Sequence, residues 1–162
     1  MEETQGKTGV PSEKRQKPER PRDELGRPLA WDAENRLHLP DFDALGPDEN
    51  HELGRRYARE GNVFGAHEAW ETAWKQARGT GDEEFFKGLS QMGAGYVHLR
   101  RGNAHGAVTL LRRGARRVRG YPDPHRGIGT AGLATRLEAD AAAVEDGSLV
   151  PGPDATVEPP PV

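Results

Sequence analysis

Between residues 48 and 147 the apolar residues recur at intervals of three and four, which is the spacing of one face of an α-helix. Glycines and prolines interrupt this pattern at regular points. The segments between them predict five helices, over residues 48–60, 62–78, 82–101, 103–119 and 131–145. No segment alternates between apolar and polar residues with a period of two, so we expect an all-α fold without a β-sheet.

A short pattern, Gly-Asn-x-x-Gly-Ala, occurs at residues 61–66 and again 41 residues later at 102–107. In each copy the first glycine can end a helix with a positive φ, and the asparagine can cap the next helix. We expect the Gly-Ala pair to let the two backbones approach closely. The repeat predicts two helical hairpins with elbows similar to those of tetratricopeptide-type repeats. With the fifth helix, they would form an antiparallel bundle.

Both ends of the chain differ in composition from this central domain, 48–147. Residues 1–28 carry few apolar side chains and many charges, so we expect them to be disordered. Residues 29–47 predict a linker that packs on the core, because scattered apolar residues alternate with prolines. Residues 148–162 contain five prolines and predict a second disordered tail.

Composition excludes several classes of protein. The chain of 162 residues has no cysteine, which removes disulfides, thiolate metal sites and a cysteine nucleophile. Its net charge of −3 does not favour a nucleic-acid partner. Neither a membrane span nor a secretory signal is visible, so we expect a cytoplasmic protein whose partner is a small molecule or a peptide, and homo-oligomers are compatible with this composition.

The fourth predicted helix carries an arginine cluster, defined as Arg112, Arg113, Arg116, Arg117 and Arg119. No aromatic residues are interleaved with it for base stacking. We therefore expect these arginines to be solvated or paired with acidic residues of the same chain.

The second and third helices carry polar residues where an amphipathic helix needs none. His67 and Glu71 are four residues apart and flank the apolar stripe of their helix. On the third helix, Lys87, Gln91 and His98 share one narrow arc. If these faces meet, His67, Glu71 and His98 form a nitrogen–oxygen–nitrogen ligand set for Zn, Mn or Fe, with open positions for water. The alternative is a buried hydrogen-bonded pair of His67 and Glu71 that fixes how the helices dock.

Other residues near this set have subordinate roles. Trp70 and Trp74 predict core or pocket walls. We expect Lys87 and Gln91 to be solvated or to form interhelical hydrogen bonds, with lining of the pocket as the alternative. The remaining histidines at helix ends and loops predict ordinary surface positions: His51, His105 and His125.

The runs 58–74, 86–92 and 98–107 together resemble the domain-of-unknown-function family 309, whose members carry an A-H-E-x-x-E-x-x-W motif followed by a G-L-x-Q helix. The resemblance covers about residues 50–121. It implies an α-helical bundle and a metal-dependent hydrolase. The motif positions of this chain are His67, Glu68, Glu71 and Trp74, with Gln91 and His98 behind them.

Two functions follow from these observations. The first is a metal-dependent hydrolase in which His67, Glu71 and His98 are ligands and Glu68 is the general base. The second is a small helical-repeat-like protein-interaction module without catalysis, which the two elbows suggest.

Overall fold

The computed structural model describes residues 18–162, and in this part of the chain it contains five α-helices and no β-strand. The helices are α1 (Pro47–Arg59), α2 (Val63–Gln76), α3 (Glu83–Arg100), α4 (Ala104–Arg119) and α5 (Thr130–Asp146), preceded by a 3₁₀ turn, η1 (Phe42–Ala44). The predicted all-α fold is confirmed. Each helix lies within two residues of its predicted bounds.

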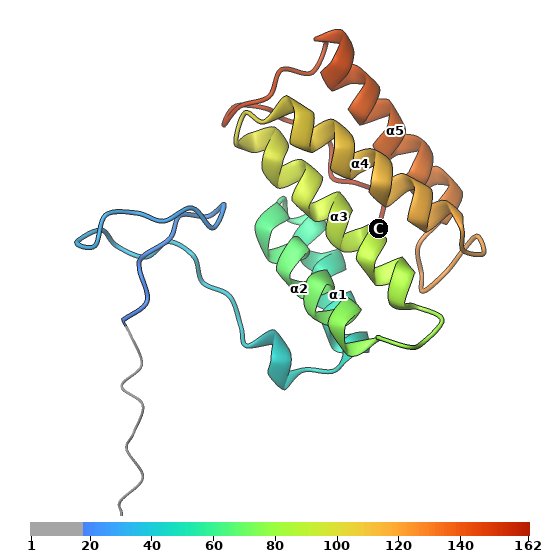
Figure 1. The fold of residues 1–162 in the computed structure, drawn as a ribbon, viewed down its shortest axis with the longest axis horizontal. Coiled ribbons are helices and arrows are strands. Elements are labelled where there is room, and N and C mark those ends of the chain that lie inside the picture. Colours follow the sequence, from blue (N-terminus) through green and yellow to red (C-terminus); the bar gives the residue numbers. More distant parts are fainter. Residues whose placement is uncertain (1–17) are drawn as a thin grey trace, which may run out of the picture.

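The helices are arranged in the order of the chain (Figure 1). Each packs mainly against the helix before it and the helix after it, so α3 lies between α2 and α4. One continuous apolar core runs through these contacts. Its largest fully buried side chains include Trp70 of α2, Phe85, Phe86 and Leu89 of α3, Leu111 of α4, and Leu133 and Leu137 of α5.

The two elbows have the same construction, as the repeat predicts. Gly61 and Gly102 adopt positive φ values of 78° and 81°. The side chain of Asn62 accepts a hydrogen bond from the Gly65 amide at 2.9 Å, and Asn103 does the same with Gly106 at 3.0 Å. The second glycine of the pattern serves a different purpose from the one we expected. A Cβ at Gly65 would lie 2.7 Å from the Asn62 side chain, so this glycine makes room for the cap and not for a second helix.

Neither α1 nor α3 has a side-chain capping hydrogen bond at its N-terminus. Gly46 occupies the N-cap of α1, and Asp48 lies in its first turn. Asp82 occupies the N-cap of α3 but makes no side-chain capping bond. Both carboxylates instead bind Arg126, in the loop between α4 and α5, at 2.7 and 2.8 Å.

Close helix contacts occur where glycines face a neighbouring backbone or side chain. Gly93 faces the backbone of His67 on α2. Gly88 and Gly95 face α4 at Arg117 and Leu111. The glycines of α3 therefore admit a different helix on each side.

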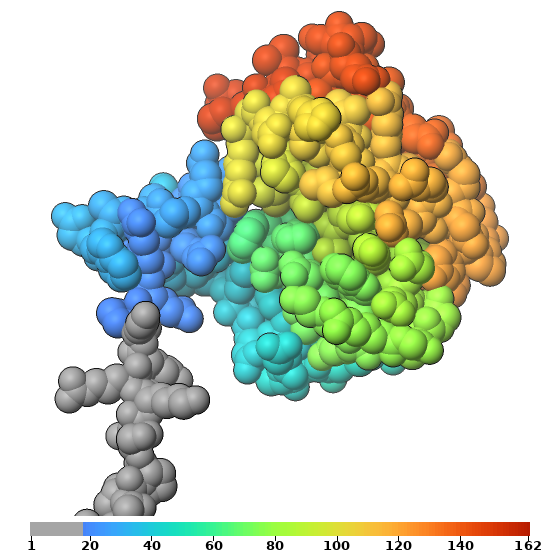
Figure 2. Space-filling model, in the orientation of Figure 1, coloured from blue at the N-terminus to red at the C-terminus, as the bar shows by residue number. Residues whose placement is uncertain are grey.

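The N-terminal segment of the described chain, residues 18–46, has no α-helix and lies beside the helical domain, projecting from it (Figure 2). Residues 1–17 of the predicted disordered tail are outside the described residues. In residues 18–28, Asp23 is buried and accepts hydrogen bonds from Leu25 and Arg27. Gly26, inside the predicted disordered tail, packs against the ring of Phe64 on α2, and Phe42 of the predicted linker is buried.

The C-terminal segment, residues 148–162, differs from the predicted disordered tail. It has no helix, but the Gly152 amide donates to the Leu99 carbonyl at 2.8 Å. The Arg59 guanidinium donates to the Val162 carbonyl at 2.9 Å. The prediction counted prolines and overlooked the apolar side chains between them. These pack against the core: Leu149, Ala155, Val157 and Val162.

None of the five helices combines the length and the apolar character that crossing a membrane requires.

Candidate functional site

One turn and a half of α2 carries three ligand-type side chains, those of His67, Glu68 and Glu71. Each side chain has one nitrogen or oxygen atom that lies within 4.8 Å of such an atom in each of the other two. Glu71 is four residues from His67 and three from Glu68, so the helix alone brings the three together. All three side chains are half-buried. Among residues 18–162 this is the group with the arrangement of a metal centre.

The imidazole of His67 is held at both nitrogens. Its Nδ1 lies 2.9 Å from the carbonyl oxygen of Ser90 on α3, and its Nε2 lies 3.2 Å from Oε2 of Glu71. A carbonyl oxygen can only accept, so Nδ1 carries the proton of that bond. Nε2 is therefore the nitrogen that faces the carboxylates and can receive either a second proton or a cation.

His67 and Glu71 shift each other's pKa toward the charged form of each side chain. The hydrogen bond from His67 lowers the pKa of Glu71 to about 2, with a further contribution from Lys75, whose Nζ lies 2.9 Å from Oε1. Burial lowers the pKa of His67, but the bonds to Glu71 and to the Ser90 carbonyl outweigh it and leave that pKa raised. Without a metal, His67 in its protonated form pairs with Glu71, which also pairs with Lys75.

Ser90, His67 and Glu71 resemble a nucleophile–base–acid arrangement, because Ser90 Oγ lies 3.1 Å from His67 Nδ1. Two observations argue against that chemistry. Ser90 is only 3 % exposed, so a substrate cannot reach its hydroxyl. Moreover, Nδ1 already donates to the Ser90 carbonyl and has no lone pair with which to take the hydroxyl proton.

The structure does not bring His98 into this group. His98 lies near the end of α3, and its Nδ1 is 3.0 Å from the Asn103 side-chain amide at the second elbow. Burial and the nearby charge of Arg101 lower its pKa. The residue that joins His67 and Glu71 in the cluster is instead Glu68, which we had expected to act as a general base.

The neighbouring residues that we expected around the site lie at contacts between helices, and Gln91 forms an interhelical hydrogen bond, as one of its expected roles requires. Lys87 lies over the ring of Trp74, 5.1 Å from its centroid. Gln91 accepts a hydrogen bond from Arg117 of α4 at 3.0 Å, so it joins α3 to α4. Trp70 is fully buried in the core, as expected for a core aromatic residue.

His51 is not the surface residue that its place near the start of α1 suggested. It is 3 % exposed, its Nδ1 accepts from Trp70 Nε1 at 3.1 Å, and its Nε2 lies 2.9 Å from the Arg126 carbonyl oxygen. Burial lowers its pKa. A sequence signal existed: His51 shares a helix face with the buried Gly54 and Ala58.

His125 is also more enclosed than expected. Its Nε2 lies 2.7 Å from Asp82, and its ring packs edge-on against Phe85. Together with Arg126, it joins the loop after α4 to the start of α3. These histidines hold helices together and lie apart from the cluster on α2.

The arginine cluster of α4 is largely neutralised within the chain. Arg112 pairs with Glu145, Arg117 with Glu84 and Arg119 with Glu138. For these three arginines the expectation of acidic partners is confirmed.

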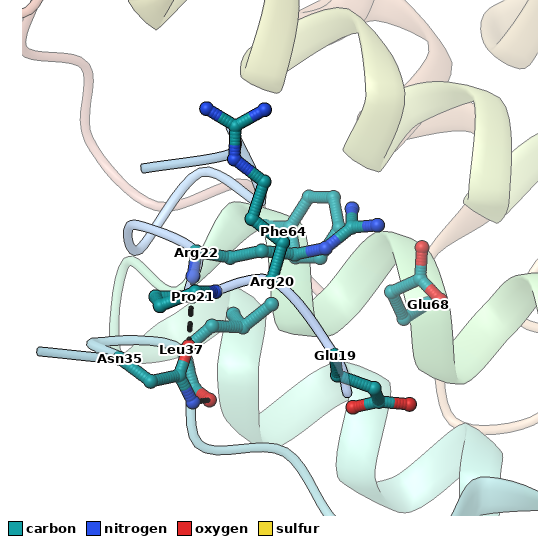
Figure 3. Close-up of a pocket in the computed structure, with 8 residues that line it drawn as sticks. All are labelled: Glu19, Arg20, Pro21, Arg22, Asn35, Leu37, Phe64 and Glu68. Carbon is teal, nitrogen blue, oxygen red and sulfur yellow. Dashed lines mark hydrogen bonds between the residues drawn. The ribbon is translucent and has the colours of Figure 1, made fainter. Parts of the chain in front are cut away.

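A pocket of about 530 Å³ lies between the N-terminal segment and α2 (Figure 3). It reaches the cluster of His67, Glu68 and Glu71 at Glu68. The N-terminal segment supplies most of its lining, and α2 supplies Phe64 and Glu68 on the other side. The cluster is therefore accessible from a concave surface of a size typical of small-molecule sites, roughly 300–1,000 Å³.

One nitrogen and two carboxylates suit divalent cations of intermediate hardness such as Zn, Mn or Fe(II). Metal-bound histidines commonly donate their other ring N–H to a carbonyl or carboxylate, and Nδ1 of His67 does so to Ser90. The donor set and its support therefore fit a metal ion. They also fit a proton held between His67 and Glu71.

Comparison with known proteins adds a family. A search of curated proteins and a search of solved structures each give no match. The family model "Domain of unknown function (DUF309)" matches residues 52–110, which include α2 with its cluster and α3. Over these residues, about a third of its length, the chain is similar to the DUF309 family.

Proposed function

We propose that this protein binds a divalent metal ion through His67, Glu68 and Glu71 and that it is a metal-dependent hydrolase. The observation that carries the proposal is the convergence of these three side chains beside a pocket. The family match over residues 52–110 is compatible with it but describes no activity.

The residues of the chain have separate tasks in this proposal. Ser90 fixes the imidazole of His67 through its carbonyl, so that Nε2 faces the ligand position. Lys75 holds one oxygen of Glu71 and leaves the other directed at His67. Glu68 borders the pocket, and its two oxygens let it hold the metal through one and accept a proton from water through the other. The metal, when bound, would supply a Lewis acid that lowers the pKa of water.

The first experiment is metal analysis of protein purified without a histidine tag, followed by calorimetric titration with Zn²⁺, Mn²⁺ and Fe²⁺. We expect one ion per chain. The variants H67Q and E71Q should weaken binding by about tenfold or more each, because either change removes a ligand. E49Q is the matched control, since Glu49 is an exposed carboxylate in the first turn of α1.

Two results would contradict metal binding: purified protein without stoichiometric metal, and a melting temperature that chelator and added metal leave unchanged. His67 and Glu71 would then be the docking pair that we considered as the alternative. If metal binds but no ester, amide or phosphoester is hydrolysed in a metal-dependent manner, the hydrolase half of the proposal fails.

The two equivalent elbows keep the interaction module as a second candidate, since such hairpins also build peptide-binding surfaces. This candidate predicts a partner whose binding is the same in H67Q and in the native protein. A pull-down comparison of the two proteins separates it from the metal proposal.

A further inference from the structure

The pocket between the N-terminal segment and α2 combines an apolar wall with cationic side chains. Phe64, Leu37 and Pro21 provide the apolar part, and Arg20 and Arg22 provide two guanidinium groups. The remaining lining residues are Glu19, Asn35 and Glu68. A ligand that fits this lining has an apolar body and an anionic end.

Neither guanidinium is neutralised by a carboxylate of residues 18–162. Arg20 donates through Nε to the Leu29 carbonyl and lies over the ring of Trp31, 5.8 Å from its centroid. Arg22 donates through one nitrogen to the Gly26 carbonyl at 3.1 Å. Each guanidinium has five N–H donors, so both keep donors for an external anion while their backbone contacts position them.

The other arginines of residues 18–46 do have carboxylate partners. Arg27 forms an ion pair with Asp23, and Arg36 lies 3.6 Å from Glu24. Within residues 18–46, the two arginines with no such partner are the two that line the pocket. Phosphate accepts paired N–H donors from guanidinium groups and carries more negative charge than a carboxylate.

We propose that this pocket binds an organic phosphate, with its phosphate held by Arg20 and Arg22 and its apolar part against Phe64. As a statement of substrate class, this rests on the proposed function, because Glu68 belongs both to the pocket and to the metal cluster. The corresponding reaction is hydrolysis of a phosphomonoester. An oxygen from water bonds to phosphorus, the bond from phosphorus to the alcohol oxygen breaks, and the alcohol leaves with a proton.

Titration calorimetry with phenyl phosphate tests the pocket, first in the presence of a chelator and then with Mn²⁺. We expect binding in both conditions, tighter with the metal. The double variant R20Q/R22Q should weaken the metal-free affinity by at least about tenfold, because charge-assisted hydrogen bonds are lost. R113Q is the matched control, since Arg113 is an exposed arginine on α4.

A second measurement avoids dependence on variants that disturb the N-terminal segment. In amide NMR spectra, phenyl phosphate should shift the signals of residues 19, 20, 22, 35–37, 64 and 68, and leave those of α5 in place. Circular dichroism melts of the variants confirm that the helical domain is intact.

The outcomes separate this proposal from the preceding one. Arginine-dependent phenyl phosphate binding without any metal binding would support the pocket and refute the metal centre. Metal binding with no phenyl phosphate binding would refute the pocket alone. Equal affinity for benzoate, equal affinity of R20Q/R22Q and R113Q, or NMR shifts elsewhere would each overturn the assignment to an organic phosphate.

Discussion

The crossing of α2 and α3 leaves no space for a side chain at Gly93, which makes the variant G93A a direct test of the fold. A Cβ at this position would lie 2.8 Å from Cα of His67 and 2.9 Å from its backbone nitrogen. The obstacle is backbone, so it cannot rotate away as a flexible side chain would. The two helices must separate, or the new methyl group must be accommodated under strain.

The expected cost follows from this geometry. Overpacking of a close contact typically costs about 1–3 kcal/mol. We expect about 2–3 kcal/mol, because the whole helix contact has to shift. For a domain of this size that corresponds to a melting temperature lowered by about 8 °C or more. His67 lies at the point of contact, so the same variant should also weaken metal binding.

Thermal and urea unfolding of G93A measures this effect, with G132A as the matched control. Gly132 is exposed in α5, and a Cβ there meets nothing within 4 Å. G132A should therefore stabilise the protein by about 0.4–1 kcal/mol, since alanine restricts the unfolded chain more than glycine does. Equal stability of G93A and the native protein would show that α2 and α3 are not in the close contact described above.

Three further predictions concern other parts of the domain. Burial lowers the pKa of His51 in the folded protein. Below the ordinary pKa of 6.5, His51 therefore binds a proton in the unfolded chain more readily than in the folded protein. The free energy of unfolding should therefore fall as the pH drops below about 6.5, and urea unfolding at pH 7.5 and 5.5 should show a smaller fall in H51Q. W70F removes the donor to His51 and should cost about 1–3 kcal/mol, with a double-mutant cycle showing that the losses of W70F and H51Q do not add. N103A removes the cap on Gly106 and should cost about 1 kcal/mol in thermal melts, whereas an unchanged melting temperature would contradict the capping role.

The helices could be predicted because each carries its own signal in the sequence. Apolar periodicity marks their interiors, and the Gly-Asn elbows mark the ends at Gly61 and Gly102. Asp82 has the residue type of a cap, but its side chain binds His125 and Arg126 from 43 and 44 residues away. A contact of that kind depends on the folded arrangement and leaves no local pattern.

The candidate site could be predicted only as far as one helix determines it. The spacing of His67 and Glu71 placed them together, and the structure agrees, with a distance of 3.2 Å between Nε2 and Oε2. The expected third ligand, His98, depended on how α3 is rotated and positioned against α2. Gly93 sets that contact at His67, while His98 lies more than one turn further along α3, by the second elbow. The pocket depends on the N-terminal segment, whose position no periodicity predicts.

The network around Arg126 has a consequence for how the domain opens. A row of helices that touch chiefly their sequence neighbours would lose its outer members one at a time, as in a repeat array. The loop after α4 reaches back to α1 through Asp48 and to the buried His51 through its carbonyl oxygen. Fraying of α1 must break these links as well as its packing on α2, whereas α5 is held chiefly by α4. Hydrogen exchange should therefore progress from the α5 end of the row.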